Sequence, residues 1–195
     1  MGLNIFDAIK NNDLAEVQKC IDNGVDVNVT DKWGDTLLHI AARYGKVEVF
    51  RLLLEKKAKV NTKNKWGQTP LHVAIEFEYV DICTLLLLDR RTNVNITNKW
   101  KKTPLHIAVR YGRVEVCKLL LDRDADVNVT DENGDTPLHI AARYSMVEVC
   151  KMLLEKKAKV NTNNKWGETP LHIATKFGNV EICEILSQRN NLTKN

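Results

Sequence analysis

The five histidines of this 195-residue chain recur at an almost constant interval. They are 33, 34, 33 and 33 residues apart: His39, His72, His106, His139 and His172. The tryptophans keep the same phase, because each lies six residues before a histidine: Trp33, Trp66, Trp100 and Trp166. A period of this length is typical of stacked supersecondary units, in which like side chains form rows and do not converge on one central core.

The fifth repeat shows how each repeat is expected to be built. It begins with a polar, glycine-containing stretch, 131–135, which is typical of a tight turn. Thr136 and Pro137 favour a helix start, because a Thr hydroxyl caps the first turn and Pro needs no amide hydrogen there. We expect this helix to end near Tyr144, and the apolar spacing over 147–155 predicts a second helix. Helices this short need their neighbours for stability.

The repeated strings resemble the ankyrin repeat. Thr-Pro-Leu-His-Ile-Ala stands at 103–108, 136–141 and 169–174, with near matches at 36–41 and 69–74 and Val-Asn closures at 27–28, 60–61, 94–95, 127–128 and 160–161. The resemblance implies an all-α ankyrin-repeat solenoid of stacked helix-turn-helix units with projecting β-turn fingers. It also implies a single domain, 1–195, with repeats at about 1–30 as N-cap, 31–63, 64–97, 98–130, 131–163 and 164–195 as C-cap.

Several positions depart from the family pattern. The glycine expected after the second helix is replaced three times, by Lys57, Asp124 and Lys157, at a cost of about 1 kcal/mol each. The third repeat has one extra residue within 85–93, so its second helix is longer or its loop bulges. In the fourth repeat Lys101 replaces the turn glycine. Such departures are the first places to look for function.

We expect neither a metal site nor a cofactor site, and no enzymatic activity. Four cysteines share one phase, and Phe50 fills that slot in the second repeat, which indicates core packing: Cys83, Cys117, Cys150 and Cys183. Stacked helices lie about 8–10 Å apart, too far for equivalent cysteines to pair or for equivalent histidines to share an ion. The resemblance instead implies that each histidine hydrogen-bonds to backbone and links adjacent loops.

Composition limits the compartment and the partner. The net charge of +4 is too small to indicate nucleic acid by itself, and the longest leucine run, Leu85–Leu88, is far too short to span a bilayer. With no signal-peptide core, we expect a cytoplasmic, soluble chain and no membrane partner. Ankyrin-repeat proteins of viruses and intracellular bacteria often act on host proteins, so a host cell is an alternative compartment by analogy.

The resemblance implies a surface that binds other macromolecules, usually proteins, through the turn tips and the concave face of the first helices. The turn-tip candidates are Trp33, Trp66, Lys99, Trp100, Lys101, Lys102 and Trp166. The concave-face candidates are Arg43, Tyr44, Phe77, Arg110, Tyr111, Arg143 and Tyr144. Trp, Tyr and Arg are the residues that most often dominate binding energy. The alternative is structural: each ring packs against the next repeat.

Three functions stay open. The first is a monomeric, non-enzymatic module or scaffold that binds a protein with acidic and apolar surface, centred on Trp66, Trp100 and Tyr111. The second is a binder of nucleic acid or an anionic surface, which predicts a steep loss of affinity with salt. The third is a spacer or the targeting arm of a larger protein, which predicts no autonomous partner.

Overall fold

The structure is a computed structural model that describes residues 4–192, with side chains to residue 190. It divides into two compact units between Lys99 and Trp100, which we call the N-terminal half and the C-terminal half. The described residues form twelve helices and no strand, apart from one isolated bridge between Thr30 and Thr36. The predicted helical, ankyrin-repeat fold is therefore confirmed.

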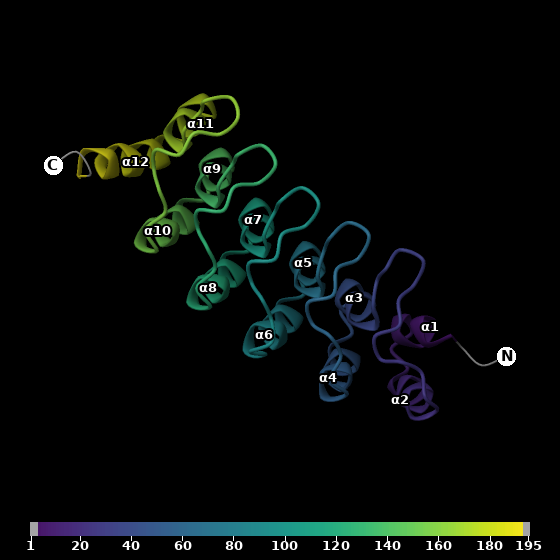
Figure 1. Ribbon diagram of the computed structural model, residues 1–195. Coiled ribbons are helices and arrows are strands. Elements are labelled where there is room, and N and C mark those ends of the chain that lie inside the picture. The colour runs from purple at the N-terminus through teal and green to yellow at the C-terminus, as the bar shows by residue number, and fades with distance from the viewer. Residues whose placement is uncertain (1–3, 193–195) are drawn as a thin grey trace. The chain divides into compact units, whose positions relative to one another are not determined.

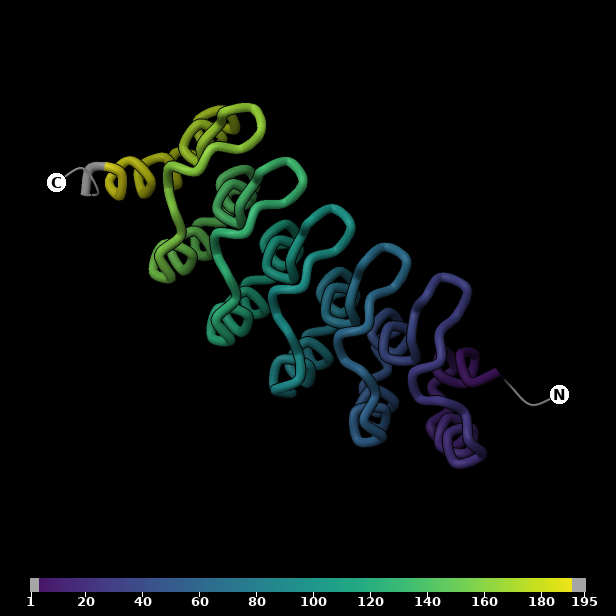
Figure 2. Tube along the Cα trace, in the orientation of Figure 1, coloured from purple at the N-terminus to yellow at the C-terminus, as the bar shows by residue number. Residues whose placement is uncertain are grey.

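Three helix pairs build each half. The N-terminal half contains α1 (Ile5–Lys10), α2 (Leu14–Asp22), α3 (Leu37–Arg43), α4 (Val47–Glu55), α5 (Pro70–Glu76) and α6 (Val80–Leu88). The C-terminal half contains α7 (Pro104–Arg110), α8 (Val114–Asp122), α9 (Pro137–Arg143), α10 (Val147–Glu155), α11 (Pro170–Lys176) and α12 (Val180–Leu192). Within each half the first helices of the pairs pack on one another in one layer and the second helices in another (Figure 1). The long loops project beside the layer of first helices (Figure 2).

The core of each half lies between the two helical layers. Side chains with almost no exposure come from both, such as Leu38 of α3 and Leu53 of α4. Phe50, Cys83, Cys117 and Cys150 occupy equivalent slots, and all four are fully buried. The cysteines are free, and burial raises the pKa of Cys117 to about 12 and that of Cys150 to about 11. The interpretation as apolar core residues is confirmed for Cys83, Cys117 and Cys150, whereas Cys183, in the last repeat, is only half-buried.

The extra residue of the third repeat lies in a loop. Helix α6 has nine residues, as do α4, α8 and α10, so it is not longer. Asp89 follows it with extended backbone, and the Arg91 guanidinium pairs with the Asp89 carboxylate. The Asn61 side chain of the preceding repeat donates to the Arg91 carbonyl at 2.7 Å. The bulge is therefore fixed at both ends by polar contacts.

The residues that replace the expected glycines have left-handed backbone conformations, as the sequence predicts. Lys57, Asp124 and Lys157 have φ angles of 63°, 54° and 65°, and Lys101 has a φ of 56°. This conformation brings Cβ close to the carbonyl oxygen and costs a residue other than glycine about 1 kcal/mol.

Replacing Lys157 with glycine should therefore stabilise the chain by about 1 kcal/mol, because the side chain is exposed and only the backbone penalty is removed. The measurement is urea unfolding. Lys156→Gly is the matched control, since Lys156 has an ordinary φ of −83° and should lose stability. Equal effects at the two positions would contradict the assignment of strain to Lys157.

Candidate partner-binding surface

Each projecting turn, here called a finger, is a five-residue loop fixed by its first side chain. The fingers are residues 31–35, 64–68, 98–102, 131–135 and 164–168. In the second repeat Asp31 Oδ1 accepts the amides of Trp33 and Asp35 at 2.8 and 2.9 Å. In the third, Asn64 Oδ1 accepts the amides of Trp66 and Gln68 at 3.0 Å each. This Asx-type turn holds the tryptophan at the tip.

Neighbouring fingers are joined in register. In the N-terminal half the Lys65 amide donates to the Trp33 carbonyl at 2.9 Å, and the Asn64 side chain donates to the Asp35 carboxylate at 2.8 Å. In the C-terminal half the Asn164 side chain donates to the Asp135 carboxylate at 2.9 Å. The tips in each half are thus held side by side by hydrogen bonds.

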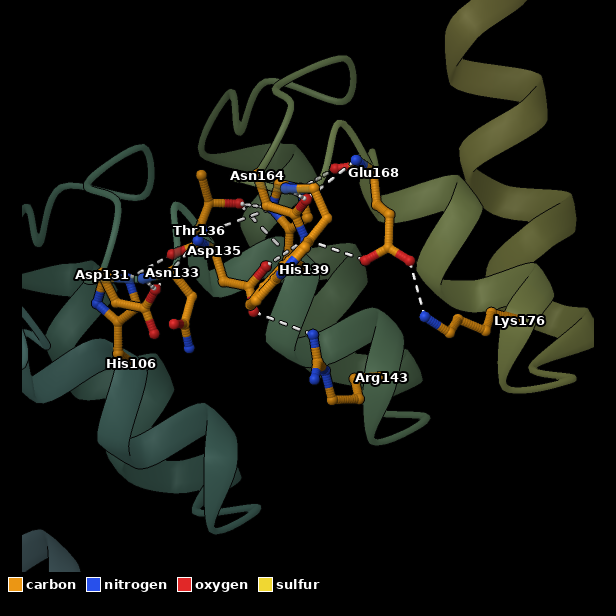
Figure 3. Close-up of polar contacts among 11 residues, drawn as sticks. His106, Asp131, Asn133, Asp135, Thr136, His139, Arg143, Asn164, Glu168 and Lys176 are labelled. Carbon is orange, nitrogen blue, oxygen red and sulfur yellow. Dashed lines mark hydrogen bonds and ion pairs between the residues drawn. The ribbon is translucent and has the colours of Figure 1, made fainter.

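Three buried histidines fix the height of the following finger above the helices. His106 Nδ1 accepts the Thr103 amide at 3.2 Å, while its Nε2 lies 3.2 Å from the carbonyl oxygen of Asp135 in the next finger. His39 and His139 make the equivalent contacts to the carbonyls of Gln68 and Glu168, the latter among the residues drawn in Figure 3. A carbonyl only accepts, so each imidazole carries its proton on Nε2. His39, His106 and His139 therefore link adjacent loops, as the resemblance implied, whereas the printed contacts of His172 are to Thr169 of its own repeat.

Burial keeps these imidazoles neutral. It lowers the pKa of His106 from 6.5 to about 4, and it lowers the pKa of His39 and His139 as well. Above pH 6.5 the His106 side chain is neutral in both the folded and the unfolded states. As the pH falls towards 4 the unfolded chain binds a proton that the folded chain rejects, so stability is lost through this interval.

The wild-type chain should lose roughly 3 kcal/mol of folding stability between pH 7 and pH 4 through His106, beyond what carboxylates contribute. His106→Gln removes this titration and should have a flatter profile, although it is less stable at pH 7. The free energy of unfolding, measured against pH for both proteins, tests this. Parallel profiles would show that His106 does not control the acid sensitivity.

A second contact joins the fingers of the second, third, fifth and sixth repeats to the end of the first helix of the same repeat. The last finger residue and a helix residue eight positions later form what we call the finger–helix pair. Arg43 donates to Asp35 at 2.9 Å, Gln68 to Glu76 at 2.9 Å, Arg143 to Asp135 at 3.0 Å and Lys176 to Glu168 at 2.8 Å. Two of these pairs are drawn in Figure 3. The fourth repeat has Lys102 and Arg110 at these positions.

These pairs were not predicted, although Arg43 and Arg143 were among the candidate residues. The signal was present as opposite charges eight residues apart in a fixed phase, at positions 35 and 43, 135 and 143, and 168 and 176. The finger folds back over the first helix of its repeat, so two residues eight positions apart in the sequence come into contact. Arg43 and Arg143, two of the predicted binding residues, therefore form ion pairs within the fold and are only partly exposed.

The predicted aromatic residues remain accessible. Trp33, Trp66 and Trp100, in the fingers of the second, third and fourth repeats, are 38–47% exposed, and Trp166, in the last repeat, is 63% exposed. Tyr44, Phe77, Tyr111 and Tyr144 are 42–44% exposed. Each ring therefore packs partly on the fold and presents the rest to solvent. Cations cover some of the packed faces, with Lys32 4.3 Å from the centre of Trp33 and Arg43 5.2 Å from that of Phe77.

Aromatic and charged residues gather in hollows between the fingers and the first helices. In the N-terminal half a cavity of about 620 Å³ is lined by Trp33 and Trp66 from the fingers, Arg43 and Tyr44 from α3, and Phe6 from α1. This cavity brings four of the predicted residues together.

The C-terminal half has two smaller hollows. One, of about 310 Å³, is lined by Arg143, Trp166 and Phe177. The other, of about 70 Å³, is lined by Lys102, Arg110, Arg143 and Tyr144. Lys99 and Lys101 are exposed. Trp66 and Trp100, the predicted centre, belong to different halves, and each is described within its own half.

Two observations bear on other kinds of site. Among residues 4–192, no group of three or more His, Cys, Asp or Glu side chains is arranged to hold a metal ion. No helix in the described part of the chain is long and apolar enough to cross a membrane.

Comparison with known proteins defines the family. A model of ankyrin repeats, three copies long, matches residues 5–98, 86–164 and 129–195, which together cover nearly all of the sequence. The chain belongs to the ankyrin-repeat family. A segment of 45 residues is also 44% identical to inversin of Danio rerio, an alignment that spans 23% of this chain and 4% of inversin. The similarity therefore covers only a small part of inversin.

Proposed function

We propose that this chain is a non-enzymatic protein-interaction module that binds a protein partner through its finger tips and the concave face of its first helices. Membership of the ankyrin-repeat family supports this, because such repeats are generally interaction modules. The observation that carries the proposal is the set of half-exposed aromatic rings around the 620 Å³ cavity of the N-terminal half. Partly exposed Trp and Tyr beside Arg are the usual composition of an interface centre.

The state of the histidines supports a role without catalysis. His39, His106 and His139 are fully buried, neutral, and hydrogen-bonded through both ring nitrogens. A general base must reach its substrate, and these rings face the backbone of the fingers. The free cysteines are compatible with a reducing compartment, and we propose the cytoplasm.

Trp33→Ala with Trp66→Ala tests the proposal at its centre. The double variant should lose the proteins that the wild-type chain captures from a cell extract, since each such anchor contributes about tenfold or more in affinity. Its melting temperature should fall only modestly, because both rings are partly exposed and the fingers are held by backbone and Asx contacts that remain. Leu88→Ala, on a 75% exposed residue of α6, is the control and should capture the same proteins.

A double variant that folds and still captures the same proteins would contradict the proposal. The alternative, binding to nucleic acid through the exposed finger lysines, is separated from it by salt. Phosphate contacts weaken steeply as salt rises, because counterions are released on binding. An aromatic-centred protein contact should change modestly over the same range.

A further inference from the structure

The 620 Å³ cavity of the N-terminal half has a largely aromatic wall. Phe6 of α1, Tyr44 of α3 and the finger residues Trp33 and Trp66 contribute rings, and Ile40 of α3 adds an aliphatic side chain. The ring of α1 is half-buried, and the other three are 38–47% exposed. A group that enters the cavity therefore contacts apolar surface from two first helices and two fingers.

Two ion pairs lie in the same wall. The Lys10 ammonium is 3.3 Å from the Asp7 carboxylate, one helical turn away on α1. The Arg43 guanidinium is 2.9 Å from the Asp35 carboxylate in the finger–helix pair of the second repeat. These four charged groups are thus engaged with one another.

The two remaining charges of the wall are also engaged within the chain. Asp31 Oδ1 accepts the amides of Trp33 and Asp35, at 2.8 and 2.9 Å. The Lys32 ammonium lies 4.3 Å from the centre of the Trp33 ring, which is within the range of a cation–π contact. Among the described residues that line the cavity, three cations therefore balance three carboxylates.

We propose that this cavity binds one large, uncharged apolar side chain of the protein partner, such as Phe, Trp or Leu. The inference rests on the proposed function and names the group that the partner inserts. A charged side chain would lose hydration and would have to compete with the existing pairs for an opposite charge. An apolar side chain covers the exposed parts of the rings and disturbs none of these contacts. The cavity accommodates even a Trp side chain, since a water molecule takes only about 30 Å³.

A hollow of the C-terminal half has the same composition. Its apolar lining stands at the positions of the tryptophan, isoleucine and tyrosine of the second repeat: Trp166, Ile173 and Phe177. Lys176 in its wall pairs with Glu168 at 2.8 Å. Arg143, the other cation of the wall, pairs with Asp135 at 3.0 Å. Each half therefore has an apolar hollow whose charged wall residues are paired within the chain.

The probe is a peptide selected from a library of random linear peptides displayed on phage, with the full-length wild-type chain as the target. Each apolar residue of the selected peptide is replaced in turn by Ala and by Glu, and the affinities are measured by titration. At one position, the anchor, Ala should weaken binding about tenfold or more. Glu at the anchor should weaken binding at least as much, because the cavity has no cation to spare.

Two variants of the chain locate the anchor. Phe6→Ala and Tyr44→Ala each remove one ring of the cavity wall, and each should weaken the parent peptide about tenfold. Their effect on the peptide with Ala at the anchor should be smaller, because the same contact is not lost twice. The control is Leu88→Ala, at a 75% exposed residue of α6, which should bind both peptides as the wild-type chain does. Thermal unfolding of each variant checks that it is folded.

Other outcomes separate the inference from the proposed function. Peptides that bind equally well with Glu at every apolar position would overturn the uncharged occupant and leave the interaction module standing. An anchor whose replacement costs the same in Phe6→Ala, Tyr44→Ala and the wild-type chain would lie elsewhere on the surface, which would also overturn the site alone. Failure to enrich any peptide would overturn the site and the proposed function together, and oligothymidine bound in its place would favour the nucleic-acid alternative.

Discussion

This surface depends on the hydrogen bonds that the buried imidazoles of His39, His106 and His139 donate to the next finger. One ring nitrogen accepts the amide that begins its own helix, and the other donates to a carbonyl of the following finger. The same side chain therefore fixes the helix start and the position of the neighbouring loop. Burying a polar group without a hydrogen-bond partner is unfavourable in free energy, so the arrangement is stable only when both contacts form.

Because of this arrangement, the candidate binding residues form rows of equivalent side chains. A repeat that is translated along the chain places equivalent residues beside one another, so the tryptophans mark successive finger tips and the tyrosines or phenylalanines mark successive helix ends. The fourth repeat changes one such row, because Lys102 and Arg110 stand at the positions that form the finger–helix pairs elsewhere.

Much of the fold could be predicted from the sequence, because the signals are local and repeated. Thr136 and Pro137 begin α9 as expected, and α10 covers 147–155 as its apolar spacing predicts. The extra residue of the third repeat could not be placed beforehand, since helix extension and a loop bulge satisfy the same length. The exposed fraction of each tryptophan side chain could not be predicted from the sequence either, because it depends on how closely the next finger approaches. The finger–helix pairs were overlooked because residues eight apart meet only after the finger folds over its helix.

The tautomer and charge of the buried histidines test this account most directly. Nitrogen-15 NMR of the imidazole side chains at pH 7 should show His39, His106 and His139 neutral, with the proton on Nε2 and slow to exchange with water. Rings that exchange rapidly between tautomers, or that carry the proton on Nδ1, would contradict the account. In that case the carbonyls of Gln68, Asp135 and Glu168 would lack the donor that positions the fingers.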